Sequence, residues 1–332
     1  MAVTLKDVAE RAGVSRSAVS RTFTSGASVS SKTRAKVEAA ALELGYAPNA
    51  LASSLTTGRT KLIGLIANNF RNPLILDVFD LFTRGLQDRG LRPLLVNLSG
   101  ATDPAASVRM LRQYSVDGVI VASSTLPPSF AQAFRAANIP VVHAFGRHSI
   151  APAVHVVGID NVACGQMAAL ALISRGYQSL GFLGGPATAT STQDRAAGFL
   201  QGLAGRPDVS VMMRYATDYT FEAGRLEMQR LLTRTPAQAY FCGDDLLAVG
   251  ALAAIEEAGL AVPEDIGLIG LNDMAMSGWQ NIGLTTIRQP VDEIIDAAID
   301  LVVATIDEPE RPPETRLFPC RIIERRTLRA LA

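Results

Sequence analysis

Apolar residues at the start of the chain recur at the spacing of a helix. Four of them lie three and four residues apart on one face of a short helix: Leu5, Val8, Ala9 and Ala12. Thr4 and Asp7 have the spacing of a capping box, and Gly13 can adopt the left-handed conformation that ends a helix. The pattern predicts one short helix that ends at Gly13.

A second helix is predicted directly after this glycine. Ser15 is a suitable N-cap, and Val14 and Val19 have the spacing of a hydrophobic staple. The helix, about residues 16–23, would bury Val19, Ala18 and Phe23 and leave outside the polar residues Arg16, Ser17, Ser20 and Arg21. Two short helices around a tight turn form a helix-turn-helix, whose second helix enters the DNA major groove, although ordinary helical hairpins share this pattern.

A third helix and a short polar segment complete this region. Ser30 or Ser31 caps a helix over about 32–44, which Gly45 ends and whose inner face carries Val37, Ala40, Ala41 and Leu44. Residues 48–58 read either as a linker or as a short helix with Leu51, Ala52 and Leu55 on one face. A helix of this length is not stable alone in water and folds only against a partner.

From residue 61, short apolar strands alternate with helices. Strands are expected at KLIGLIAN, RPLLVNLS, DGVIVASS, IPVVHAF, VHVVGID, SLGFLGG, VSVMMRYA, AQAYFCG and DIGLIGL. Helices are expected at about 73–89, 103–115, 129–138, 161–176, 192–203, 220–232 and 246–258. Such alternation predicts two doubly wound lobes with parallel sheets. The last helix, about 291–306, and the strand TRLFPCRII must join edges of one or both lobes, so several crossings between the lobes are expected.

Charge separates the two regions. The 332 residues have no net charge, but residues 1–60 carry a net charge of +4 and the remainder −4. A basic head on an acidic body is expected when one end alone meets phosphate. Three scattered cysteines, a polar N-terminus and no membrane-spanning apolar run predict a cytoplasmic protein without a membrane partner.

The carboxyl ends of the parallel strands are expected to surround one cleft between the lobes, where ligands bind. Position alone selects the following candidates: Asn69, Phe70, Arg71, Asn72, Ser123, Ser124, Phe145, Arg147, Arg195, Tyr219, Asp244, Asp245, Asn272, Asp273 and Gln289. Any one of them could instead cap a helix or stabilise a loop. Together they suit a sugar or a base with hydroxyl groups.

No catalytic constellation is evident. GGPATAT lacks two glycines of a dinucleotide fingerprint, and GxSxG, HExxH and P-loop motifs are absent. The spacing of His143, His148 and His155 does not suggest a metal site. We therefore expect no catalytic residues, no metal and no cofactor, with a sugar-modifying enzyme as a remote alternative.

The whole chain resembles the lac repressor (LacI/GalR) family of bacterial transcription regulators. The resemblance runs from about Thr4 to Arg326 and rests on ordered stretches: TLKDVAERAGVS, AVSR, ELGYAPNALA, SLTTGRT, IGLI, RNP, VDGVI, GIDN, FLGGP, DRAAGF, VPEDI and LTTIRQP. It implies a repressor that binds a near-palindromic operator in double-stranded DNA as a homodimer. It also implies a periplasmic-binding-protein-like core with a small effector in the cleft. No leucine heptad follows the last strand, so a tetramer formed through such a tail is not expected.

The resemblance also assigns roles to residues. Arg16, Ser17 and Arg21 become base readers, Ser15 and Ser20 lie nearer the phosphates, and Leu55 enters the minor groove. The expected DNA-binding set is Thr4, Ser15, Arg16, Ser17, Ser20, Arg21, Asn49, Ala52 and Leu55. The expected effector-binding set is Phe70, Asn72, Ser123, Phe145, Arg147, Arg195, Tyr219, Asp244, Asn272 and Gln289.

Three of these positions depart from the family's pattern. Asn272 and Phe145 stand where many or some relatives have an acid, and Asp244 stands where an Asn is usual. Loss of acid at two positions, with Arg195 kept, favours an effector with a carboxylate or few hydroxyls, such as a sugar acid. Neutral sugars remain an alternative.

The expected organisation has three parts. Residues 1–47 form the helix-turn-helix domain, 48–60 a hinge helix or linker, and 61–332 the effector-binding core. Within the core, one subdomain takes about 61–160 and 290–318, and the other about 161–289 and 319–330. The competing interpretation is a cytosolic solute-binding protein without a transcriptional role, which the basic head argues against.

Overall fold

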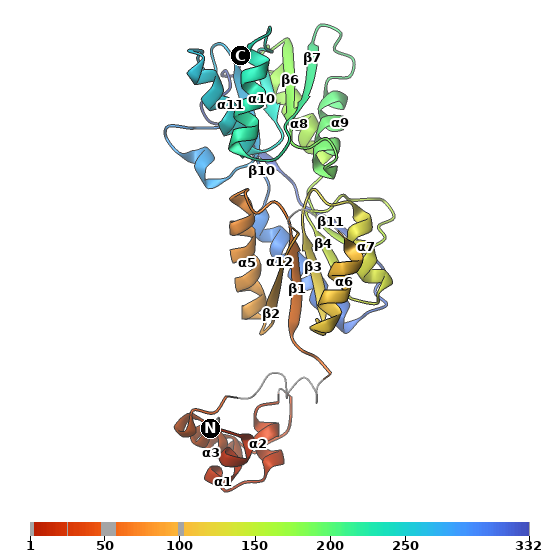
Figure 1. Ribbon diagram of the computed structural model, residues 1–332, viewed down its shortest axis with the longest axis vertical. Coiled ribbons are helices and arrows are strands. Elements are labelled where there is room, and N and C mark those ends of the chain that lie inside the picture. Colours follow the sequence, from red (N-terminus) through yellow and green to blue (C-terminus); the bar gives the residue numbers. More distant parts are fainter. Residues whose placement is uncertain (1–2, 25, 48–57, 99–102, 332) are drawn as a thin grey trace. The chain divides into compact units, whose positions relative to one another are not determined.

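The computed structural model describes residues 3–24, 26–47, 58–98 and 103–331. These belong to two compact units, Met1–Lys61 and Leu62–Ala332, which we call the head and the core (Figure 1). Each has buried apolar residues of its own, so each is a structural unit in its own right.

The described part of the head contains three helices: α1 (Leu5–Ala12), α2 (Arg16–Thr22) and α3 (Ser31–Leu44). The predicted caps are confirmed. Thr4 and Asp7 form a capping box, and the Ser15 and Ser30 side chains accept hydrogen bonds from backbone N–H groups at the start of α2 and α3. Gly13 ends α1 in the left-handed conformation, with φ of 65°. Local sequence signals therefore define the starts of the three helices and the end of α1.

The head packs around six buried apolar residues: Val8, Ala9, Val19, Val37, Ala40 and Ala41. The predicted burial of Phe23 is wrong, because α2 ends at Thr22 and it is Thr22, not Phe23, that is buried against the other helices. Thr22 is 4% exposed and its hydroxyl donates to the Ala18 carbonyl, whereas Phe23 is 36% exposed. The Phe23 ring lies 5.9 Å from that of Tyr46, at the edge of the bundle.

The first lobe of the core contains a parallel six-stranded sheet in the order β11-β5-β4-β3-β1-β2. Its strands are β1 (Leu62–Ala67), β2 (Arg92–Asn97), β3 (Gly118–Ala122), β4 (Val141–Ala144), β5 (His155–Gly158) and β11 (Thr315–Leu317). Its helices are α5 (Leu74–Asp88), α6 (Pro104–Gln113), α7 (Pro128–Ala136) and α12 (Val291–Asp307). Residues of α5 and α12 pack on one face of the sheet, and residues of α6 and α7 pack on the other.

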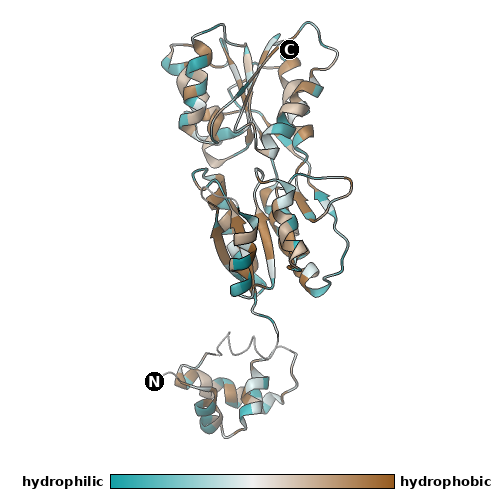
Figure 2. Ribbon diagram, turned by 45° about the vertical axis from the view of Figure 1, so that its right-hand side comes forward, coloured by the Kyte–Doolittle hydropathy of each residue, from teal (hydrophilic) through white to brown (hydrophobic). Residues whose placement is uncertain are grey.

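The second lobe has the same plan with strand order β12-β10-β9-β8-β6-β7, except that the edge strand β12 is antiparallel to β10. Its strands are β6 (Ser179–Gly184), β7 (Ser210–Tyr215), β8 (Ala239–Cys242), β9 (Gly267–Asn272), β10 (Thr286–Arg288) and β12 (Arg321–Ile323). Its helices are α8 (Asn161–Ile173), α9 (Thr190–Gly202), α10 (Phe221–Leu232), α11 (Asp245–Glu257) and the 3-10 helix η1 (Ala275–Gly278). Helices α8 and α9 cover one face, and α10 and α11 the other. Figure 2 shows apolar residues concentrated on the strands.

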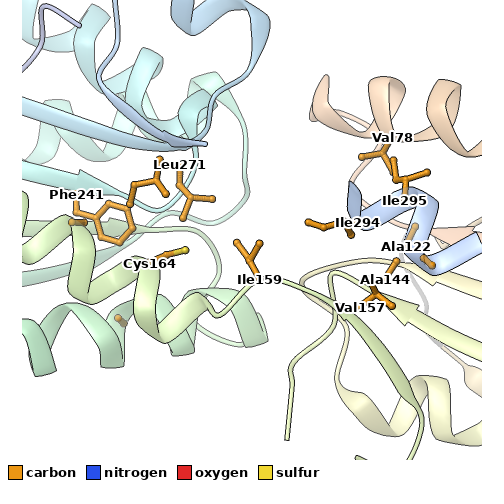
Figure 3. Packing of buried hydrophobic residues seen from close by; sticks show 14 of the residues in the cluster. Val78, Ala122, Ala144, Val157, Ile159, Cys164, Phe241, Leu271, Ile294 and Ile295 are labelled. Atoms are coloured by element: carbon orange, nitrogen blue, oxygen red, sulfur yellow. The ribbon is translucent and has the colours of Figure 1, made fainter. Parts of the chain in front are cut away.

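The chain passes between the lobes after β5, after β10 and after β11. The single strand predicted at TRLFPCRII is divided into β11 and β12, which join different sheets. Pro319 lies between them and has no N–H to donate to a ladder. Ile159 on the first connection lies between Val157 of one lobe and Cys164 of the other (Figure 3). Two elements were not predicted, β10 and η1, because three or four residues carry too little periodicity.

Candidate functional site

The outer surface of α2 is polar and basic. Arg16, Ser17, Ser20 and Arg21 are all exposed, while Val19 on the opposite side is fully buried. Arg16 makes no hydrogen bond or ion pair within the described residues, and Arg21 makes only a long contact, 3.4 Å, from Nε to the Ser17 carbonyl. Two guanidinium groups are therefore free to meet an external partner.

Two other members of the expected DNA-binding set have structural roles as caps. The Thr4 hydroxyl donates to Asp7 Oδ2 at 2.8 Å. Ser15 Oγ accepts from the Ala18 N–H at 3.2 Å and lies 2.9 Å from Ser17 Oγ. Both side chains are exposed, so capping leaves them accessible to a phosphate. The remaining members, Asn49, Ala52 and Leu55, lie outside the described residues.

The core contains a partly open cavity of about 60 Å³ at the carboxyl ends of the strands of both lobes. Since about 10–15 Å³ on this measure holds one water, the cavity has room for a few small groups. It brings together eight of the ten expected effector-binding residues: Asn72, Ser123, Phe145, Arg195, Tyr219, Asp244, Asn272 and Gln289. The first three come from the first lobe.

Asp244 is the polar centre of this cavity. It is the N-cap of α11, and Oδ1 accepts from the Leu246 N–H at 2.7 Å. Its Oδ2 accepts from Asn72 Nδ2 at 3.0 Å and from Asn272 Nδ2 at 2.8 Å. Burial, with repulsion from Asp245, raises the pKa of Asp244 to about 7 despite these donors. The side chain can therefore gain or lose a proton near neutral pH.

Asp245 is equally buried but has a structural role. Its carboxylate accepts from the Met274 N–H and the Ser277 hydroxyl, both at 2.8 Å, and from the Thr286 hydroxyl. Burial raises its pKa to about 6. These bonds attach η1 and β10 to α11, so Asp245 supports the wall of the cavity without lining it.

Arg195 enters the cavity from α9 and is 4% exposed. Its Nε donates to Asn161 Oδ1 at 2.8 Å, and Nη1 donates to the Gly243 carbonyl at 2.5 Å. Within the described residues it forms no ion pair. The guanidinium is therefore held by neutral acceptors and keeps its charge available to the cavity.

Backbone geometry also marks this site. Asn69, Phe145 and Asn272 line the cavity and have φ of 60°, 62° and 124°, a region that residues with a side chain rarely adopt. All three lie at or just after the carboxyl ends of strands. Strained backbone of this kind concentrates at ligand sites, where the surrounding fold must hold it in place.

Two expected effector-binding residues lie outside the cavity. The Phe70 ring stacks on Phe79, with 5.1 Å between the ring centroids. Arg147 of the first lobe forms a 2.7 Å ion pair with Asp194 of the second, and its Nη2 donates to the Thr190 carbonyl at 3.0 Å. Arg147 therefore joins the two lobes in this structure.

Sequence reasoning missed one polar residue that matters here, Asn161. It begins α8, it is 5% exposed, and its Oδ1 accepts from Arg195. A signal was present, because Asn161 follows β5 within the GIDN stretch. Asn69, Ser124 and Thr125 also line the cavity and were not in the expected effector-binding set.

Comparison with known proteins identifies the class of protein. Residues 4–49 match the family described as "Bacterial regulatory proteins, lacI family", and residues 169–328 match a "Periplasmic binding protein-like domain". The chain is 34% identical to the HTH-type transcriptional repressor PurR of Escherichia coli O139:H28 (strain E24377A / ETEC), across 98% of this chain and 96% of that protein.

Two solved structures extend the similarity to the fold. One is the lac repressor dimer bound to operator and the anti-inducer ONPF, with a TM-score of 0.89 and 27% identity over 99% of this chain and 100% of that one. The other is a complex of the transcriptional regulator CelR with cellobiose, with a TM-score of 0.73 and 27% identity over 98% and 99%.

The chain belongs to the lacI family of bacterial regulatory proteins. It is a DNA-binding transcriptional regulator with an effector-binding core, and it is not an enzyme. The predicted fold class is confirmed, and the alternative of a solute-binding protein without a transcriptional role is not supported. No helix in the described part of the chain is long and apolar enough to span a membrane.

Proposed function

We propose that this regulator is a repressor that binds a near-palindromic operator as a homodimer and responds to a small sugar or sugar acid in the core cavity. The observation that carries the proposal is the pairing of two features in one chain. One is the basic outer face of α2, and the other is a cavity shared by two lobes, whose lining includes the buried polar side chains of Arg195 and Asp244. The relatives named above support both halves. A repressor of this kind acts on the chromosome, and we therefore assign it to the cytoplasm.

In this proposal α2 enters the major groove, where Arg16, Ser17 and Arg21 read bases. Arginine is suited to this role because its guanidinium pairs bidentately with guanine O6 and N7. Thr4, Ser15 and Ser20 contact phosphates, which position the helix without reading sequence. The assignment of Asn49, Ala52 and Leu55 to the minor groove rests on the sequence resemblance alone.

We assign the dimer contact to one side of the core. Exposed leucines occur on α5 and α10, at Leu76 (62% exposed) and Leu226 (50% exposed), and these helices lie on the same side of their lobes in Figure 1. Covering them with a second copy would remove apolar surface from water. Two copies related by a two-fold axis would present two α2 helices to a symmetric DNA site.

Selection from a pool of random double-stranded DNA by the full chain tests the proposal. The expected result is enrichment of one two-fold symmetric sequence, bound at a stoichiometry of two chains per site. Leu55→Ala is expected to weaken binding to that sequence far more than binding to random DNA, because an apolar wedge acts only in the specific complex. Enrichment of an asymmetric sequence bound by one chain, or no enrichment at all, would contradict the proposal.

A further inference from the structure

The cavity holds a buried guanidinium, that of Arg195, which forms no ion pair within the described residues, although the carboxylate of Asp244 lies near enough to interact with its charge. Arg195 is 4% exposed, and its two hydrogen bonds within the described residues go to the neutral acceptors Asn161 Oδ1 and Gly243 O. No hydrogen bond or ion pair occupies Nη2 within the described residues. A ligand with an acceptor at this position would therefore meet a charged donor that the described protein groups leave unoccupied.

Asn161 supplies a second donor beside this guanidinium. Since its Oδ1 accepts from Arg195 Nε, the orientation of the amide is fixed, and Nδ2 is the atom left for a ligand. Nδ2 has no hydrogen-bond partner within the described residues, and Asn161 lines the cavity. Arg195 and Asn161 are thus neighbours that both line the cavity, and each has an N–H group without a partner among the described residues.

The protein already uses part of the acceptor capacity of the cavity. Asp244 receives three N–H donors on its two oxygens. Asn72 Oδ1 accepts from the Leu74 N–H, and Asn272 Oδ1 accepts from Gln289 Nε2. Because an oxygen accepts two hydrogen bonds, Asp244 Oδ2 has no capacity left for a ligand hydroxyl, and the other three oxygens can accept one more each. A ligand rich in acceptors would meet the free donors of Arg195 and Asn161 directly.

We propose that the effector carries a carboxylate group, which accepts hydrogen bonds from Arg195 Nη2 and Asn161 Nδ2. This inference rests on the proposed effector-binding function and narrows it from sugars in general to acids such as uronates and aldonates. Hydrogen bonds between ionised groups are shorter and stronger than neutral ones, which gives the acid its advantage over the corresponding alcohol.

The charges around the site give the binding a characteristic pH dependence. Three groups interact with the charge of Asp244. They are Arg195 on α9, Asp245 on α11 and the Cys242 thiol on β8. Asp273, which also acts on Asp245, is paired with Arg288 and Arg325. A second carboxylate in this small cavity disfavours the charge on Asp244, whose pKa is about 7 when the cavity is empty. An acid should therefore bind more tightly as pH falls from about 8 to about 6, with uptake of a proton. A neutral sugar that donates a hydroxyl to Asp244 should show the opposite trend.

The experiment compares matched pairs of ligands on the full chain by calorimetry: glucose with glucuronate, galactose with galacturonate, and glucitol with gluconate. Within each pair, the acid has a carboxylate where its neutral partner has a hydroxymethyl group. The expected result is that the acid of at least one pair binds about tenfold or more tightly than its neutral partner. Titrations in two buffers of different ionisation enthalpy measure the expected proton uptake.

Two variants test the assigned atoms. Asn161→Asp supplies an internal counter-ion to Arg195, and Arg195→Gln removes the charge; each is expected to abolish the preference for the acid. Asn281→Asp, which adds the same charge on an exposed loop, is expected to preserve it. The unfolding transition of each variant shows whether it folds. If Asn161→Asp or Arg195→Gln does not fold, the ligand preference of the other variant tests the assignment.

Two outcomes would overturn the inference. One is that, in every pair for which binding is detected, the neutral sugar or polyol binds as tightly as the acid. The other is no binding of any acid by a chain that still selects a symmetric operator, which would leave the DNA-binding half of the proposed function intact. A chain that selects no DNA would instead contradict the proposed function itself, so the two failures are distinguishable.

Discussion

Asn72 of the first lobe donates a 3.0 Å hydrogen bond to Oδ2 of Asp244 in the second lobe. The same oxygen accepts from Asn272 of the second lobe at 2.8 Å. One carboxylate oxygen therefore receives donors from both sides of the cleft. Because these donors favour the ionised form, closure of the lobes and the charge of Asp244 are linked.

This buried acid should make the stability of the core depend on pH. Burial and Asp245 raise the folded-state pKa of Asp244 to about 7, whereas an unfolded aspartate titrates near 4. The folded chain thus binds more protons than the unfolded chain between these values, and its stability falls as pH rises from about 4 to about 7. The contribution of Asp244 to this loss is at most about 4 kcal/mol. Chemical denaturation across this pH range measures it.

The variant Asp244→Asn removes the titrating group while keeping the shape of the side chain. We expect a shallower pH dependence and, above pH 7, a stability equal to or greater than that of the unmodified chain. Asp77→Asn, which removes an exposed carboxylate from α5, serves as the control. Parallel pH profiles for Asp244→Asn and the unmodified chain would show that another group is responsible.

A second connection between the lobes predicts an effect on effector affinity. Arg147 and Asp194 form a 2.7 Å ion pair across the cleft, with side chains 32% and 21% exposed. If ligand binding requires the closed core, Arg147→Gln should weaken effector affinity by roughly twofold to tenfold, since such a pair contributes about 1 kcal/mol. Calorimetry with a bound effector gives the value.

The control for this prediction is another arginine pair on the same lobe as Asp194. Arg206 and Asp208 lie 2.7 Å apart near the start of β7 and do not cross the cleft. Arg206→Gln should leave effector affinity unchanged. Equal loss in both variants would indicate a general effect of charge and remove the role assigned to the interlobe pair.

The sequence predicts most of the fold because local signals decide it. Caps and glycines at Thr4, Gly13 and Ser15 fix the helices of the head, and continuous apolar runs fix the strands of the core. The errors arise where tertiary packing decides. Phe23 has an apolar side chain, but the end of α2 one residue earlier leaves it at the edge of the bundle.

The cavity was predictable only in part, for a related reason. Strand ends are visible in the sequence, so residues that follow strands could be named. The side-chain partner of each residue could not. Arg147 and Arg195 were both named because each comes after a strand. Arg147, however, forms an ion pair with Asp194 outside the cavity, whereas Arg195 lies in the cavity and donates hydrogen bonds to neutral acceptors. Pairing between residues 47 positions apart leaves no local trace in the sequence.

The three cysteines should differ in their reactivity. Cys320 is half-buried and lies against Cys164, whose thiol hydrogen-bonds to it. This bond lowers the pKa of Cys320 and raises that of Cys164, while burial raises the pKa of Cys242. Because the thiolate is the nucleophile, iodoacetamide should modify Cys320 first. Mass spectrometry of peptides from the native chain measures the order, and faster modification of Cys242 would contradict it.

The last prediction concerns base reading by α2. Arg21 is exposed on the outer face of the helix and has only one weak internal contact. Arg21→Ala should therefore cost about 1–3 kcal/mol of binding to the selected operator and relax the choice of base at one symmetric position in each half-site. Competition binding with single-base operator variants measures both effects.

A matched control separates base reading from loss of charge. Arg11→Ala removes the same charge from the head, but its guanidinium is already paired with Glu43 at 2.7 Å and lies on α1. Base preference should be unchanged in this variant. If Arg21→Ala instead weakened binding equally on all sequences and reduced the dependence of affinity on salt, Arg21 would contact phosphate, because phosphate contacts carry the salt dependence and no sequence information. Base reading would then have to rest on Arg16 and Ser17.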